Sequence, residues 1–133
     1  MRSDLITLTV PARGEYAKTV RLTAAELASR LGMSYDEVDD VRMAAEEAFV
    51  YACSCLGDDD DVTFTFDVAP GSLSVAVGPL PGTCAPAGRP REESYAEFIL
   101  RSVCDEFAIE AGEDSCTLRL NRRVAALPED AGA

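Results

Sequence analysis

The sequence contains no histidine and no tryptophan, and lysine occurs once, at Lys18. Histidine is the commonest acid–base side chain at neutral pH and the commonest metal ligand, so its absence excludes a Ser–His or Cys–His nucleophile pair. No apolar run approaches the roughly 20 residues of a membrane span, and nothing at the N-terminus resembles a signal peptide. We therefore expect a cytoplasmic protein without membrane contact.

Positive charge is also scarce. The formal net charge is −12 and the sequence pI is about 4.3. Such a charge opposes contacts with phosphates, so direct binding to nucleic acid is not expected, and a basic protein surface is the better partner. The run GDDDD at 57–61 could meet such a partner, or it could be a solvated acidic turn.

The cysteines do not form a metal-binding pattern. There are five of them, an odd number, and no C-x-x-C spacing occurs. We expect reduced, buried or half-buried thiols and no metal site. The positions are Cys53, Cys55, Cys84, Cys104 and Cys116.

The segment from Ser34 to Gly57 organises the chain as one long helix. Ser34 followed three residues later by Glu37 predicts a capping box, which satisfies two helix-end N–H groups. Gly57 is a suitable residue for the helix C-terminus. Apolar residues at spacings of three and four predict one buried face, made of Val38, Val41, Ala45, Ala48, Ala52 and Cys55.

The remaining patterns predict an α+β fold, a two-layer sandwich in the order β-α-α-β-β-loop-α-β-β. Apolar residues alternate in the strand segments and recur with helical period elsewhere. The expected elements are a strand at 4–10, helices at 14–31 and 35–56, a hairpin at 62–78, a loop at 78–93, a helix at 94–105 and a hairpin around 112–115. The length of 133 residues suits one domain, 1–121, with a flexible tail at 122–133.

Within the long helix, AAEEAFVYA resembles the first ATP-binding motif of the RsbW-like anti-sigma factor serine kinases, members of the GHKL (Bergerat) ATPase superfamily. In that family a helical glutamate is followed four residues later by asparagine. The glutamate position falls on Glu47, and Tyr51 occupies the asparagine position. The resemblance implies Mg-ATP as cofactor and a role for Glu47 beside the serine hydroxyl of a protein substrate, but a phenol is a poor Mg²⁺ ligand. The order of elements resembles the same family over about 5–121, which implies a fold of GHKL type.

The two other nucleotide-binding elements of the family are degenerate. Its Asp-x-Gly-x-Gly loop corresponds to GPLPG, where Gly78 replaces the aspartate, Leu80 replaces the first glycine, and Gly82 remains. Its glycine-rich segment at the start of the last helix corresponds to ESYAE, with Tyr95 and Ala96 at glycine positions. An adenine amino group left without its acceptor would cost about 1–3 kcal/mol. We therefore expect a pseudo-kinase that uses no cofactor.

What remains is a binding surface. In the family, an arginine on the first helix contacts both the sigma factor and the STAS-domain anti-anti-sigma protein, and by residue match this is Arg21 in TVRLTAAEL. The resemblance implies an anti-sigma factor of a stress response, acting by partner switching as a homodimer. Arg21 could instead be a solvated arginine paired with a local glutamate.

Two other functions stay open. Glu47 favours an active serine kinase that uses Mg-ATP to phosphorylate a STAS anti-anti-sigma factor. A small-molecule sensor would instead use the groove closed by Tyr51 and the loop at 78–93.

Overall fold

The computed structural model describes residues 3–82 and 92–125. Its elements follow the predicted order, so the α+β class and the order of elements are confirmed. They are β1 (Asp4–Pro11), the 3₁₀ turn η1 (Gly14–Tyr16), α1 (Ala17–Arg30), α2 (Tyr35–Ser54), β2 (Asp61–Ala69), β3 (Ser72–Pro81), α3 (Glu92–Val103), β4 (Glu106–Ala111) and β5 (Ser115–Arg123).

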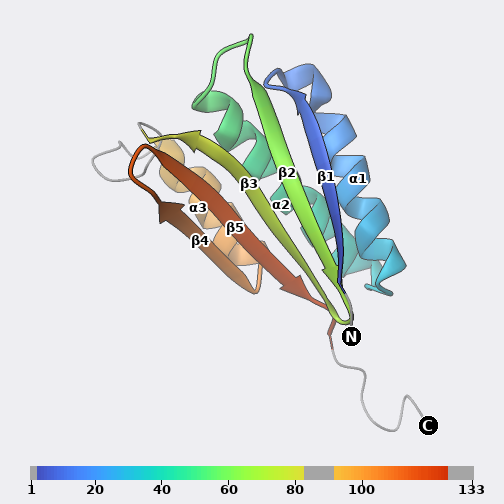
Figure 1. Ribbon diagram of the computed structural model, residues 1–133. Coiled ribbons are helices and arrows are strands. Elements are labelled where there is room, and N and C mark those ends of the chain that lie inside the picture. The colour runs from blue at the N-terminus through green and yellow to red at the C-terminus, as the bar shows by residue number, and fades with distance from the viewer. Residues whose placement is uncertain (1–2, 83–91, 126–133) are drawn as a thin grey trace, which may run out of the picture.

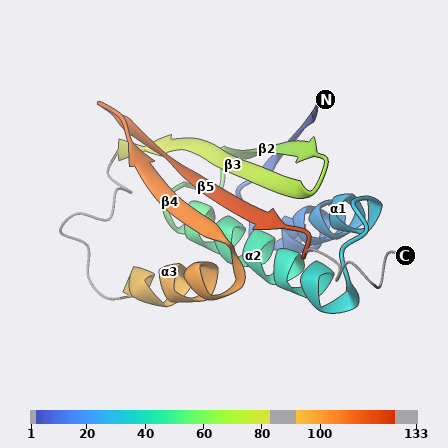
Figure 2. The ribbon, with the colours of Figure 1, turned by 90° about the horizontal axis from the view of Figure 1, so that it is seen from below.

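The strands form one antiparallel sheet of five strands in the order β1-β2-β3-β5-β4. The last strand of the chain therefore lies inside the sheet, between β3 and the edge strand β4 (Figure 1). Seen from below, α1, α2 and α3 lie on one side of the sheet and no described element covers the other (Figure 2). The predicted two-layer sandwich is thus confirmed, and one face of the sheet stays open.

Alternation along the strands separates the core from the open face. On β2, Phe64 and Phe66 are fully buried toward the helices, whereas Thr65 between them belongs to the other face. The ring centroid of Phe64 lies 6.4 Å from the ring centroid of Phe49 on α2 and 5.9 Å from that of Phe66. Aromatic pairs at such distances contribute packing energy beyond the area they bury. The long helix is therefore anchored over the middle of the sheet.

The predicted capping box at the start of α2 is present. The N–H of Glu37 donates to Ser34 Oγ at 3.1 Å, and Glu37 Oε1 accepts from the N–H of Ser34 at 2.7 Å. Of the predicted apolar face, four members are buried and two are half-buried. The buried ones are Val41, Ala45, Ala48 and Ala52, and the half-buried ones are Val38 and Cys55.

Several predicted boundaries are wrong by one to three residues. The first helix does not begin at 14, because Gly14–Tyr16 forms a separate 3₁₀ turn before α1. The second ends at Ser54 rather than 56, because the N–H groups of Cys55 and Leu56 bond three residues back, to Ala52 and Cys53. The last helix spans Glu92–Val103 instead of 94–105.

Two larger corrections concern segments predicted to be irregular. The loop expected from 78 begins later, because β3 continues to Pro81 with a bulge between Val77 and Leu80. The tail expected from 122 also begins later, because β5 extends to Arg123 and the N–H of Val124 still donates to the carbonyl of Gly71 at 2.8 Å. The rest of that loop, 83–91, and residues 126–133 of the tail lie outside the described residues.

The cysteines that the structure describes are packed as expected. Cys53 and Cys104 are free, half-buried thiols, and burial raises the pKa of Cys104 to about 12. Cys116 is buried and Cys55 is half-buried, whereas Cys84 lies outside the described residues. In the described part of the chain, no helix is long and apolar enough to span a bilayer.

Candidate functional site

Helix α2 turns its two adjacent glutamates in different directions. Successive residues of an α-helix are about 100° apart around its axis. Glu46 faces α1, where it accepts a 3.0 Å hydrogen bond from Arg21 Nη1. Glu47 is half-buried; burial, and secondly the negative charge of Glu46, raise its pKa. The residue in the family's glutamate position therefore holds its proton more tightly than an exposed glutamate would.

Three positions of the degenerate nucleotide motifs are filled by buried side chains. Tyr51 of α2 is 4% exposed, Leu80 of β3 is 1% exposed and Ala96 of α3 is 8% exposed. All three belong to the single hydrophobic core cluster. A nucleotide site needs open volume lined by a few polar groups. Because these side chains are packed in the core, the residues at these positions do not fit Mg-ATP.

The two glycines of the GPLPG run serve the pairing of β3 with β5. Gly78 has a φ of +135°, and a Cβ there would lie 3.0 Å from the N atom of Leu80 and 3.1 Å from the carbonyl oxygen of Cys116. The N–H of Gly82 donates to the carbonyl of Asp114 at 2.8 Å. Gly78 offers no side-chain acceptor for an adenine amino group. Close packing of the backbone thus explains why glycine occupies both positions, without reference to any ligand.

Other residues of the predicted site do not join these positions. Tyr95, at a family glycine position, is 66% exposed. The residues at 83–91, which precede the last helix, lie outside the described part. Within residues 3–82 and 92–125, no group of three or more cysteine, aspartate or glutamate side chains is arranged to hold a metal ion.

Arg21, the predicted partner-binding residue, lines a hollow of about 350 Å³ between α1 and α2, called here the α1–α2 hollow. Arg42 Nη2 donates to Asp39 Oδ1 at 2.6 Å, one turn along α2 from the pair of Arg21 with Glu46. Met43 is 41% exposed in the same hollow. The hollow thus combines two arginines, two carboxylates and one apolar side chain.

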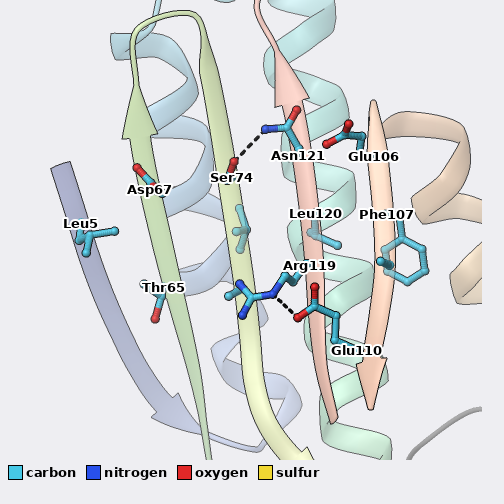
Figure 3. Close-up of a pocket in the computed structure, with 13 residues that line it drawn as sticks. Leu5, Thr65, Asp67, Ser74, Glu106, Phe107, Glu110, Arg119, Leu120 and Asn121 are labelled. Carbon is cyan, nitrogen blue, oxygen red and sulfur yellow. Dashed lines mark hydrogen bonds and ion pairs between the residues drawn. The ribbon is translucent and has the colours of Figure 1, made fainter. Parts of the chain in front are cut away.

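A larger hollow of about 520 Å³ lies on the open face of the sheet. One row of paired residues crosses all five strands there: Leu5, Asp67, Ser74, Asn121 and Glu106. Asn121 Nδ2 donates to Ser74 Oγ at 2.8 Å, and in the adjacent part of the face Arg119 Nε donates to Glu110 Oε1 at 2.6 Å (Figure 3). None of the predicted site residues lines this hollow.

Sequence reasoning missed Glu46 as the partner of Arg21. A local glutamate was the expected alternative, but Glu46 lies 25 positions away on the next helix. The only signal was indirect: α1 and α2 are joined by a short connection, which favours antiparallel neighbours. Periodicity gave no way to choose between Glu46 and Glu47.

Comparison with known proteins gives concordant results. The chain matches the family described as histidine kinase-like ATPase domain over residues 10–121. The serine-protein kinase RsbW of Bacillus pumilus is 34% identical over 110 residues, covering 79% of this chain and 67% of that protein. RsbW of Bacillus subtilis is 37% identical over 78 residues, covering 56% of this chain and 49% of the relative, so the match spans about half of its length.

Solved structures agree on the fold. A crystal structure of the RsbU and RsbW domains of a Mycobacterium tuberculosis protein superposes with a TM-score of 0.66 at 20% identity, over 91% of this chain and 32% of that chain. This likeness shows a shared fold, and together with the family match over residues 10–121 it confirms the prediction of a GHKL-type sandwich.

Proposed function

We propose that this chain, which belongs to the histidine kinase-like ATPase family, is an anti-sigma regulator of the RsbW type that acts by binding rather than by phosphorylation. It would bind an alternative sigma factor, a STAS-domain antagonist, or each in turn. The similarity to serine-protein kinases named RsbW supports the partner class. The loss of kinase chemistry is inferred from the residues of this chain.

The burial of Tyr51, Leu80 and Ala96 carries the proposal. These side chains come from α2, β3 and α3, and they are 4%, 1% and 8% exposed. Each stands where the family has an asparagine or a glycine. A nucleotide would have to displace packed side chains from the core, which costs the free energy of their burial. We infer that the scaffold has been kept and that its nucleotide pocket has been closed.

The α1–α2 hollow supports a binding role. Arg21 is partly exposed there, and Met43, the apolar side chain that lines the same hollow, is 41% exposed. An arginine presented beside apolar side chains is typical of protein interfaces, where arginine pairs with carboxylates through its fork of N–H donors. This surface is the expected contact for the partner.

Two measurements on the full chain test the proposal. Titration calorimetry with Mg-ATP should give no saturable heat, with RsbW of Bacillus subtilis as a positive control. Gel filtration with a panel of alternative sigma factors and STAS-domain proteins from the same genome should give a stable complex with at least one of them. If every member of the panel elutes separately from the chain, the regulator hypothesis fails.

An active serine kinase is the second candidate, favoured by Glu47. A glutamate with a raised pKa is closer to the range that suits general base catalysis at neutral pH. Incubation with Mg-ATP and the STAS panel decides between the two: transfer of phosphate to a STAS serine would overturn the pseudo-kinase reading. The sensor alternative, which places a ligand in the groove closed by Tyr51 and the loop at 78–93, stays a prediction, because residues 83–91 lie outside the described part of the chain.

The homodimer and the role in a stress response remain predictions. Sedimentation equilibrium of the purified chain measures the first, and expression of the gene under stress measures the second.

A further inference from the structure

We propose that Glu46 competes internally with the binding partner for Arg21, and that the α1–α2 hollow takes an acidic side chain with an apolar neighbour from that partner. This inference rests on the proposed function, because it names the chemistry by which that surface would hold its partner. It adds a residue, Glu46, whose charge would set the affinity.

The geometry of Arg21 leaves room for a second carboxylate. Arg21 Nη1 lies 3.0 Å from Glu46 Oε1, and the two side chains are 33% and 41% exposed. Within the described residues, Glu46 is the only ion-pair partner of Arg21. A guanidinium carries five N–H donors in a planar fork. Arg21 is therefore held in place by one contact while it keeps donors for an incoming group.

The charges of the hollow balance one another on an otherwise acidic protein. The chain carries a net charge of −12, yet the hollow holds two arginines against two carboxylates, with Arg42 paired to Asp39. A partner carboxylate thus meets a locally neutral surface with exposed arginine donors. Local complementarity of this kind determines register and specificity at interfaces.

An apolar side chain of the partner has a contact in the same hollow. Met43 is 41% exposed and lies on α2 between Asp39 and Glu46. Methionine adapts its shape to different partners, and it is frequent at binding surfaces for that reason. The hollow therefore fits an acidic residue beside an apolar one, as on one face of an amphipathic helix.

Glu46 and the partner would compete for the same guanidinium. Exposed ion pairs of this kind change an equilibrium constant by only about 1.5- to 5-fold. A partner can therefore displace Glu46 from Arg21. Neutralising Glu46 should increase the affinity of the partner by the same factor.

A first experiment needs no partner. Phenylglyoxal labelling followed by mass spectrometry measures the reactivity of each arginine, in the wild type and in Glu46→Gln. We expect Arg21 to label about 1.5- to 5-fold faster in the variant. The matched control is Glu26→Gln, which removes the carboxylate paired with Arg30 on the outer surface of α1 and should change Arg30 alone. Equal labelling of Arg21 in the wild type and Glu46→Gln would overturn the competition.

A second experiment uses the sigma factor or STAS-domain protein that forms a complex in the gel-filtration panel. Glu46→Gln should lower its Kd by about 1.5- to 5-fold, whereas Glu26→Gln should leave it unchanged. In the Arg21→Ala background, Glu46→Gln should lose its effect, which a merely structural role of Glu46 would not produce.

The outcomes are distinct. If the complex forms and Glu46→Gln binds no tighter, the competition is refuted while the regulator hypothesis stands. If no member of the panel binds either form, the proposed function fails, and the docking inference fails with it.

Discussion

The carboxylate of Glu37 joins the start of α2 to the backbone just after β5. Its Oε2 accepts a 2.7 Å hydrogen bond from the N–H of Ala125, 88 positions along the chain. Its Oε1 accepts from the N–H of Ser34 at 2.7 Å. Glu37 is 6% exposed and is the one charged side chain that is buried in the described residues. Glu37, which completes the capping box of the long helix, therefore also holds the backbone at the end of the sheet.

The first prediction concerns this double contact. Hydrogen bonds to the ionised carboxylate, first of all from the backbone of Ser34, lower the pKa of Glu37 below its ordinary value of 4.5. Glu37→Ala should therefore lower the free energy of unfolding by about 1.5–3 kcal/mol at pH 7. A lowered pKa means that this contribution is full above pH 4.5 and is lost as the pH falls through the pKa of the folded state.

Urea titrations at pH 7 and below pH 4 measure both effects. The control is Asp36→Ala, which removes an exposed carboxylate from the same helical turn and so carries a similar dipole term without the two backbone contacts. A difference between wild type and Glu37→Ala that stays constant across this pH range would contradict the assignment.

The second prediction concerns Tyr51. Replacing it by the asparagine of the family motif should remove a packed ring from the core and cost about 3–5 kcal/mol of stability. Because Leu80 and Ala96 still fill their positions, the variant should gain no affinity for Mg-ATP. Chemical denaturation measures the loss of stability, and calorimetry measures the affinity for Mg-ATP. The control is Val50→Asn, at a neighbouring position that is 51% exposed. Saturable binding of Mg-ATP to Tyr51→Asn would mean that this one side chain, rather than the whole site, blocks the nucleotide.

The third prediction separates two explanations for Gly82, the one glycine that remains of its motif. A Cβ at this position would lie 3.0 Å from the carbonyl carbon of Asp114. Gly82→Ala should therefore cost about 1–3 kcal/mol through overpacking, with no nucleotide present. At Gly14 a Cβ would meet nothing within 4 Å, so Gly14→Ala should be neutral or stabilising by up to about 1 kcal/mol. If both variants melt alike, packing does not explain Gly82.

Local features of the fold could be predicted because their causes are local. The capping box needs only Ser34 and Glu37, three residues apart, and both of its bonds are present. The bond from Ala125 to the same carboxylate has no such signal, since it depends on where β5 ends. The segment after Gly78 was predicted as a loop from its prolines. It is a strand because Leu80 is buried, while Pro79 and Pro81 are exposed.

The site depends on contacts between distant segments. The strand order places β5 between β3 and β4, and no periodicity contains that information. The sequence therefore could not predict the pair of Ser74 with Asn121, or the hollow on the open face of the sheet. The resemblance to a known family gave the individual positions of Tyr51, Leu80 and Ala96. That three separate segments bring them into one core is a property of the assembled fold.

The last prediction contrasts Glu46 with Glu47. Burial, and secondly the charge of Glu46, raise the pKa of Glu47. A carboxyl group whose pKa is raised by folding favours the folded state at low pH and loses that contribution as the pH rises through its folded pKa. At pH 7 the ionised group is therefore slightly unfavourable. Glu47→Gln should raise the free energy of unfolding, by less than about 1 kcal/mol, and the gain should vanish below pH 4.

Glu46→Gln should behave differently at pH 7, because it removes the ion pair with Arg21, which offsets the relief of its repulsion with Glu47. A partly exposed pair contributes about 0.2–1 kcal/mol, so this variant should be equal to the wild type or slightly less stable. Urea unfolding of both variants at pH 7 and pH 4 measures the contrast. If both substitutions raise the free energy of unfolding at pH 7, or both lower it, the two neighbouring glutamates do not have the different surroundings that the structure gives them. Neither the raised pKa of Glu47 nor the pairing of Glu46 with Arg21 could then be used to assign their roles.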